Sequence, residues 1–142
     1  MRLIVSACLL GLCTRYDGQS GEDSRVTALA QRHILIPVCP EQLGGLPTPR
    51  PASEIRDGRV ISILGADVTQ AFARGAQEGL RLFRLLGCGA AVLKSRSPSC
   101  GKGWVYDGSF SGRLTRGNGV FAALLMAGGL AVYSEEETEL IE

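Results

Sequence analysis

Three short apolar segments each lead into a cysteine, and this repeated pattern constrains the fold more than any other feature of the sequence. The pairs are residues 2–7 with Cys8, residues 34–38 with Cys39, and residues 90–93, followed by a Ser-rich turn, with Cys100. Continuous apolar runs of this length are typical of strands that are buried on both faces of a parallel sheet. The carboxyl ends of parallel strands meet at one edge of the sheet, where ligands bind. We therefore expect the three cysteines to lie close together at that edge.

Helical patterns alternate with these predicted strands. We expect helices over residues 22–33, 68–86 and 119–128, and a last short strand over residues 130–133. This alternation predicts an α/β fold with one domain over residues 1–142. The expected architecture is a Rossmann-like three-layer sandwich, with a mostly parallel central sheet, flanking helices and a small hairpin.

The helix predicted over residues 68–86 has the clearest pattern in the chain. Its apolar stripe consists of Phe72, Ala76, Leu80 and Phe83, which are spaced to lie on one face. Asp67 is a suitable N-cap for this helix. Gly75 and Gly79 carry no side chains, so we expect the helix to be able to lie close to the sheet.

The remaining segments are predicted to form hairpins, one long loop and a tail. Hairpins are expected over residues 54–64, around Asp57-Gly58, and over residues 104–114. Residues 39–51 contain four prolines and two glycines, which favour a long ordered loop without regular structure. The acidic tail from about residue 134 is expected to be frayed.

Composition and charge exclude several classes of function. The hydrophobic fraction of 45% and the charged fraction of 20% are typical of globular proteins. A formal net charge of +1 provides no basic surface, which argues against intact nucleic acid as a partner. The first residues do not form a signal peptide and no apolar run is long enough to span a membrane, so we expect a cytoplasmic protein without a membrane partner. Five cysteines, an odd number, argue against a disulfide framework.

Three thiolates at one sheet edge suit an iron–sulfur cluster or zinc. Structural zinc prefers four protein ligands, often in Cys-x-x-Cys pairs, and the chain has no such pair. The only histidine, His33, precedes a strand and belongs at the opposite end of the sheet, so a closed zinc site would need Cys13. A cubane cluster on three cysteines would leave one iron open as a Lewis acid.

The alternatives to a metal site are a metal-free thiol enzyme or three inert buried cysteines. Cys88, between two glycines on the far side of the sheet, is interpreted as structural.

Other residues near the three cysteines have both a chemical and a structural interpretation. Glu41 follows Cys39 by two residues and could shuttle protons or pin the loop. Ser97 and Ser99 could donate to cluster sulfurs or orient a substrate, although serines in such positions more often shape a turn. Lys94 and Arg96 could hold an anionic substrate or cover the sheet edge.

Several segments, in order and over almost the whole chain, match one known family. They are Ser6–Gly11, Arg15–Gly18, Cys39–Arg50, Gly65–Thr69, Lys94–Gly101, Tyr106–Gly108, Phe110–Gly112 and Gly117–Val120. With these motifs the chain resembles the bacterial family called domain of unknown function 523, which includes the thiouracil desulfidases.

The resemblance implies a cofactor, a reaction and a set of site residues. It implies a [4Fe-4S] cluster on Cys8, Cys39 and Cys100, easily lost in air, whose open iron binds the sulfur of a thiolated pyrimidine such as 2-thiouracil. Water then replaces that sulfur to give the oxo base and sulfide, without net redox change. Glu41 matches the family's acid–base carboxylate, and Ser97 matches a serine that assists. An alternative is a non-catalytic iron–sulfur or zinc module that serves a partner protein. The physiological substrate and the oligomeric state are left open.

Overall fold

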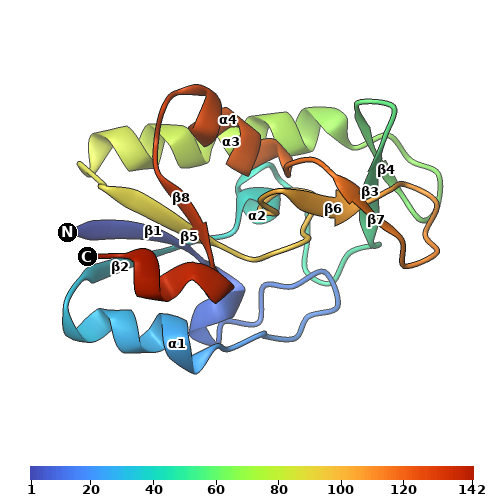
Figure 1. Ribbon diagram of the computed structural model, residues 1–142. Coiled ribbons are helices and arrows are strands. Elements are labelled where there is room, and N and C mark those ends of the chain that lie inside the picture. The colour runs from blue at the N-terminus through green and yellow to red at the C-terminus, as the bar shows by residue number, and fades with distance from the viewer.

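A central sheet of four parallel strands organises the computed structural model, which describes residues 1–142 (Figure 1). The strands are β1 (Arg2–Ser6), β2 (Ile34–Val38), β5 (Ala90–Leu93) and β8 (Val132–Ser134), and their order in the sheet is β2-β1-β5-β8. Ser6 lies opposite Val38, and Val5 lies opposite Val92. The strand order reverses between β1 and β5, because the chain continues from β1 to β2 on one side and adds β5 and β8 on the other. The predicted α/β fold is confirmed.

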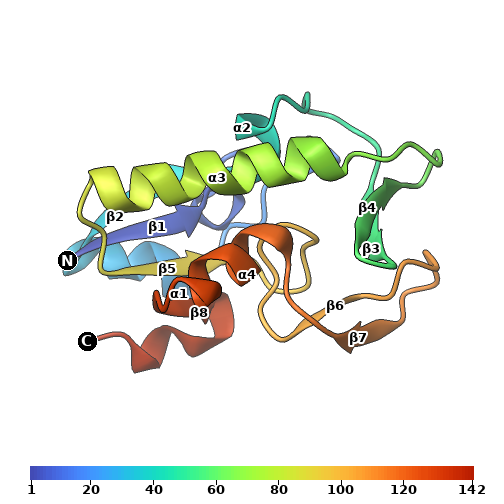
Figure 2. The same ribbon diagram turned by 90° about the horizontal axis from the view of Figure 1, so that it is seen from above.

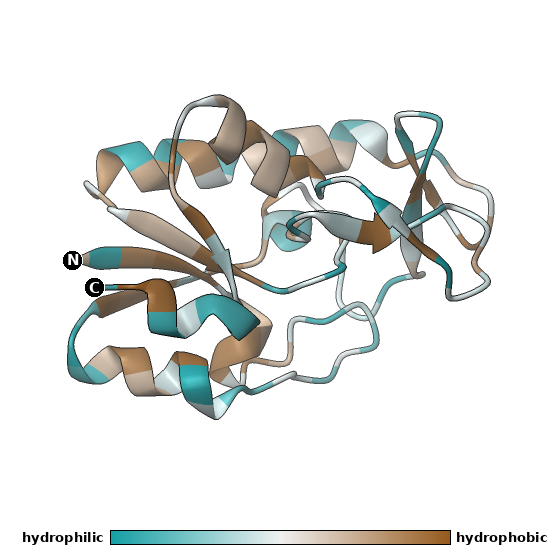
Figure 3. Cartoon of the chain, in the orientation of Figure 1, coloured by the Kyte–Doolittle hydropathy of each residue, from teal (hydrophilic) through white to brown (hydrophobic).

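Helices cover both faces of this sheet, as Figures 1 and 2 show. On one face lie α3 (Thr69–Leu85) and α4 (Val120–Ala127). On the other lie α1 (Ser24–Thr27), the 3₁₀ helix η2 (Ala28–Gln31) and the 3₁₀ helix η3 (Glu135–Leu140). The middle layer is apolar along its strands, whereas the helices carry both apolar and polar residues (Figure 3). No helix combines the length and the apolar character that crossing a membrane requires.

The side chains of each strand alternate between the two faces of the sheet, so the core has two halves, one on each face. Ile4 and Leu93 pack with Phe83 of α3 and Phe121 of α4 on one face of the sheet. The opposite face buries Leu3, Val5 and Val92 against α1, η2 and the C-terminal segment. Since successive side chains of a strand point to opposite faces, an apolar strand of this kind needs cover on both sides.

The segment over residues 39–51 contains a short helix, α2 (Pro40–Leu43), where the sequence analysis expected a loop without regular structure. Pro40 occupies the first turn of this helix, where a missing N–H costs no hydrogen bond. The prolines therefore do not prevent the helix; they lie at its start and beyond its end.

Close packing of α2 on α3 depends on two glycines. A Cβ at Gly75 would lie 1.7 Å from the Pro40 carbonyl oxygen, and a Cβ at Gly44 would lie 1.9 Å from the Ala71 carbonyl oxygen. The two glycines of α3 therefore face neighbouring helices and not the sheet, which differs from the contact expected for them. The missing side chain of Gly75 leaves room for the backbone of α2, and that of Gly79 leaves room for the ring of Phe121 in α4.

Other predicted elements are present with shifted limits. The helix expected over residues 22–33 is divided into α1 and η2. The helix α3 begins at Thr69 with Val68 at the cap position, and Asp67 instead accepts a hydrogen bond of 3.0 Å from the Thr69 N–H. Residue Ala7, expected in the first strand, begins the 3₁₀ helix η1 (Ala7–Leu10).

Two hairpins lie beyond the carboxyl end of the sheet (Figures 1 and 2). They pair β3 (Ser53–Arg56) with β4 (Arg59–Ser62), and β6 (Trp104–Tyr106) with β7 (Leu114–Arg116). Both were predicted at these places. The second extends two residues past its expected end.

The acidic tail packs against the sheet, which corrects the expectation that it is frayed. Ser134 and Glu137 form a reciprocal capping box at the start of η3. Glu135 is buried, and Ile141 completes the core on that face. Charge alone made this segment look solvated, but its acidic side chains have specific partners in the loop after β5.

Candidate active site

A cavity of about 540 Å³ opens outside the carboxyl ends of the sheet strands. In open α/β sheets this position, beside the reversal of strand order, is where ligands bind, and the volume is within the range of small-molecule pockets. Its walls come from the loops after β1, β2 and β5 and from both hairpins. The lining residues that matter for its chemistry are Cys8, Cys39, Glu41, Arg50, Glu54, Lys94, Arg96, Ser97, Ser99, Cys100, Tyr16, Tyr106 and Phe110.

The structure brings Cys8, Cys39 and Cys100 to this one cavity. Cys8 lies in η1 after β1, Cys39 precedes α2 after β2, and Cys100 lies in the loop between β5 and β6. Cys13 is exposed and Cys88 precedes β5, and neither lines the cavity. All five cysteines are free thiols.

Burial disfavours the thiolate forms of two of these cysteines. Burial raises the pKa of the Cys100 thiol to about 12, although hydrogen bonds with Ser6 and Ser99 act in the opposite direction. Burial also raises the pKa of Cys8, and the positive charge of Lys94 only partly offsets it. A cation bound at the sulfur, such as a metal, would reverse this preference and displace the proton.

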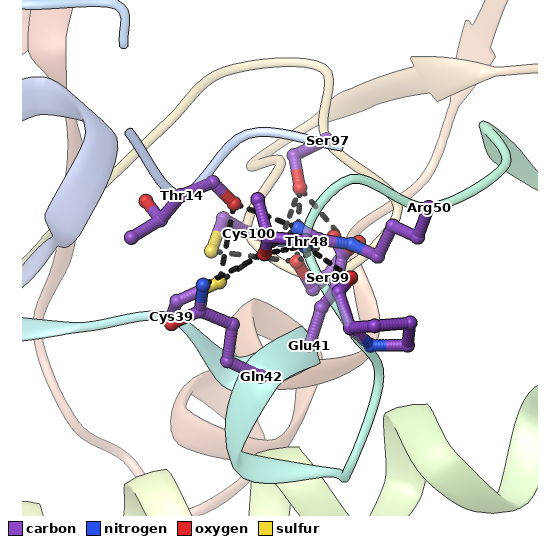
Figure 4. A network of polar contacts seen from close by, with 10 residues as sticks. Thr14, Cys39, Glu41, Gln42, Thr48, Arg50, Ser97, Ser99 and Cys100 are labelled. Atoms are coloured by element: carbon purple, nitrogen blue, oxygen red, sulfur yellow. Dashed lines mark hydrogen bonds and ion pairs between the residues drawn. The ribbon is translucent and has the colours of Figure 1, made fainter. Parts of the chain in front are cut away.

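A buried ion pair lies beside the thiols (Figure 4). Arg50 Nε donates to Glu41 Oε1 at 2.9 Å, and the two side chains are 4% and 14% exposed. The second carboxylate oxygen of Glu41 accepts a 2.8 Å hydrogen bond from the Ser99 hydroxyl. Glu41 therefore connects α2 with the loop that carries Cys100.

Ser97 shapes the turn that presents Cys100. Its hydroxyl oxygen accepts from the backbone N–H of Ser99 at 3.1 Å and from that of Cys100 at 3.0 Å. It also lies 3.0 Å from the Ser99 hydroxyl. Since Ser99 has one hydrogen and uses it toward Glu41, Ser97 is the donor between the two serines. The hydroxyls thus form a chain that ends at the Glu41 carboxylate.

Lys94 and Arg96 have different surroundings. Lys94 pairs with the buried Glu135 at 3.0 Å, which fixes it to the C-terminal segment. Arg96 has a left-handed backbone with φ of 67° and lines the cavity without an ion-pair partner.

The sequence analysis assigned no role to several residues of the site, among them Arg50 and Glu54. Arg50 lies in the Pro-rich segment after α2 and becomes a site residue only through folding. Glu54, in β3, accepts from the backbone N–H groups of Gly108 and Phe110, both at 3.0 Å, and so holds the second hairpin's loop over the cavity. For Arg50, the only indication in the sequence was its place at the end of the Pro-rich motif. For Glu54, nothing in the sequence indicated a role at the site.

Comparisons with known proteins agree with this site. The model of the 2-thiouracil desulfurase family matches residues 3–137. A solved structure described as the [4Fe-4S]-dependent thiouracil desulfidase TudS is similar with a TM-score of 0.90 and 44% identity, covering 99% of this chain and 94% of that one. An uncharacterized protein of Bacillus subtilis (strain 168), YbbK, is 37% identical over 95% of this chain and 96% of its own length. The chain belongs to the 2-thiouracil desulfurase family.

Proposed function

We propose that this protein is an iron–sulfur-dependent desulfidase, which replaces the sulfur of a thiolated pyrimidine such as 2-thiouracil with oxygen from water. The products are the oxo base and hydrogen sulfide, and no oxidant or reductant is consumed. Family membership and the similarity to TudS support this reaction. The observation that carries it is the arrangement of the cavity, where three thiols from three separate loops meet one paired carboxylate.

Cys8, Cys39 and Cys100 would hold a [4Fe-4S] cluster, since these three thiols, from three separate loops, line one cavity. The chain has no group of three or more Cys, His, Asp or Glu side chains close enough to hold one metal ion. Sulfurs that share one zinc ion lie about 4 Å apart, because each Zn–S bond is about 2.3 Å long. In a cubane each cysteine binds its own iron, so the ligand sulfurs stand farther apart. The position of Cys13 outside the cavity counts against a closed zinc site and against the non-catalytic alternative that needs it.

Such a cluster, with one iron that has no protein ligand, would supply a Lewis acid for a thiocarbonyl sulfur. The chain's own residues would handle the proton. Glu41 faces the cavity and can accept a proton from the water that attacks the carbon, then return it to a leaving or product group. The hydroxyls of Ser99 and Ser97 keep the carboxylate in place and give it a path for proton exchange.

The outer walls suit a flat heterocycle. Tyr16, Tyr106 and Phe110 line the cavity together with Arg96. Aromatic side chains bind planar rings through offset stacking or edge contacts. We assign these residues to the binding of the base, and the cluster end of the cavity to its sulfur.

The test is sulfide release from 2-thiouracil by anaerobically loaded protein, compared with the Glu41→Gln variant. We expect uracil and sulfide in equal amounts from the wild type. In the variant, turnover should fall about 100-fold or more while the iron content is unchanged. Full activity in Glu41→Gln would remove the carboxylate from the mechanism, and no sulfide from the loaded wild type would refute the proposed reaction.

A further inference from the structure

Arg50 is a buried cation whose hydrogen-bonding groups are all used inside the protein. Its guanidinium has five N–H hydrogens, and the structure shows five contacts. Nε donates to Glu41; Nη1 donates to the Pro47 carbonyl at 3.2 Å and to Thr48 Oγ1 at 2.8 Å. Nη2 donates to the Thr14 carbonyl at 2.9 Å and to Cys39 Sγ at 3.8 Å. No hydrogen is left for a substrate anion.

These contacts join three separate segments of the site (Figure 4). Thr14 belongs to the loop after β1, Glu41 and Cys39 belong to α2 and its cap, and Arg50 itself follows in the Pro-rich segment. On the other side of Glu41, Ser99 lies 2.8 Å from the carboxylate and 3.6 Å from Cys100 Sγ. The network therefore runs from Cys39 through Arg50, Glu41 and Ser99 to Cys100.

We propose that Arg50 is a positioning residue, which aims the Glu41 carboxylate at the cavity and holds it in a fixed relation to the Cys39 sulfur. This inference rests on the proposed function. A planar guanidinium suits this positioning role, because a single group must donate hydrogen bonds in several fixed directions at once. A lysine ammonium has three donors at a single point and cannot reach all five acceptors.

The first test is a double-mutant cycle on turnover by loaded protein, with Arg50→Gln, Glu41→Gln and both changes together. We expect Arg50→Gln to lower kcat about 100-fold with little change in KM, because a misplaced group loses transition-state alignment. In the Glu41→Gln background the same change should cost less than about threefold, since its target is already gone. Full additivity of the two losses would overturn the inference.

A second readout is the reduction potential of the bound cluster. Hydrogen bonds to ligand sulfurs help to set this potential. Loss of the N–H donor and of the positive charge at Cys39 should make the cluster of Arg50→Gln harder to reduce than that of the wild type. The matched control is Arg59→Lys, which changes an exposed arginine outside the cavity and should leave both turnover and potential unchanged. An unchanged reduction potential in Arg50→Gln would show that the contact between Arg50 and Cys39 has no effect on the cluster.

A crystal structure of cluster-free Arg50→Lys separates this inference from the proposed function. The variant keeps the charge, so it should fold even if Arg50→Gln does not. We expect the Glu41 carboxylate to leave its position beside Ser99. A carboxylate that stays within hydrogen-bonding distance of Ser99 would overturn the inference, whatever the loaded protein does. Absence of desulfidase activity in the wild type would instead refute the proposed reaction. The crystal structure of Arg50→Lys would still test the positioning role of Arg50.

Discussion

Ser97 and Ser99 lie two residues apart on one turn, but their hydroxyls have different tasks. Ser99 donates to Glu41, and its 2.8 Å contact with a carboxylate is stronger than its 3.6 Å contact with the Cys100 sulfur. Ser97 accepts two backbone N–H groups and thereby fixes the turn. The Glu41 carboxylate is therefore in direct contact with Ser99, whereas Ser97 lies one hydroxyl farther away.

Alanine at each serine should separate these tasks. We expect Ser99→Ala to lower kcat about tenfold while iron content and stability change little. Ser97→Ala should lower kcat and also destabilise the fold by about 1 kcal/mol, because two backbone N–H groups lose their acceptor. Turnover assays, iron analysis and urea denaturation measure the difference, with Ser111→Ala in the exposed hairpin loop as control. Equal effects of both changes on stability would contradict the division.

At the scale of elements, α2 is a four-residue helix that carries Glu41, and such a helix has little stability of its own. Its position comes from packing against α3 through Gly44 and Gly75, where backbone meets backbone. The short helix α2 is thereby held in place by α3, which is seventeen residues long. The position of the backbone that carries the Glu41 carboxylate thus depends on two glycines outside the cavity.

Gly75→Ala should damage this arrangement. In a free helix this change would stabilise by about 1 kcal/mol. Here the new methyl group would meet the Pro40 carbonyl, so we expect a net loss of about 2 kcal/mol and weaker activity. Urea denaturation gives the free energy of unfolding, and Gln77→Ala, on the exposed side of α3, is the control. A stabilised Gly75→Ala protein with full turnover would show that the close contact is not needed.

The C-terminal segment η3 holds the loop after β5 near both ends. Glu135 accepts from Lys94 Nζ at 3.0 Å and from the Ser95 N–H at 2.9 Å, and Glu137 pairs with Lys102 at 3.1 Å. Burial alone would raise the pKa of Glu135, but the hydrogen bonds from Lys94 and Ser95 outweigh it and leave the pKa below its ordinary value. The loop that presents Cys100 is therefore fixed by a charged segment from the end of the chain.

This depressed pKa makes a pH-dependent contribution to stability. A carboxyl group whose pKa is lower in the folded state stabilises the fold above its unfolded pKa of about 4.3, and the effect is lost as pH falls through the folded pKa. Glu135→Gln should therefore cost about 2 kcal/mol at pH 7 and less at pH 3. Denaturation at the two pH values tests this, with the exposed Glu139→Gln as control. An equal cost at both would contradict the assigned ionic role.

At the scale of the whole molecule, the sheet brings residues distant in sequence to one cavity, and this much could be predicted. The apolar segments before Cys8, Cys39 and Cys100 are typical of a parallel sheet. Ligands bind at the carboxyl edge of such a sheet, so the three cysteines were expected together there. The tail and α2 could not be predicted, because their local patterns indicate solvation and loop while tertiary contacts decide otherwise. The role of Arg50 could not be predicted for the same reason, since its partner Thr14 belongs to a different loop, 36 residues away in the chain.

The most direct test of the central claim is the iron and sulfide content of anaerobically reconstituted protein, measured for the wild type, Cys13→Ala and Cys100→Ala. We expect about four irons and four sulfides per chain in the wild type, with broad visible absorption. Cys13→Ala should match it, because Cys13 lies outside the cavity, and Cys100→Ala should lose both the cluster and sulfide release from 2-thiouracil. Full iron content in Cys100→Ala, or its loss in Cys13→Ala, would contradict a cluster held by Cys8, Cys39 and Cys100.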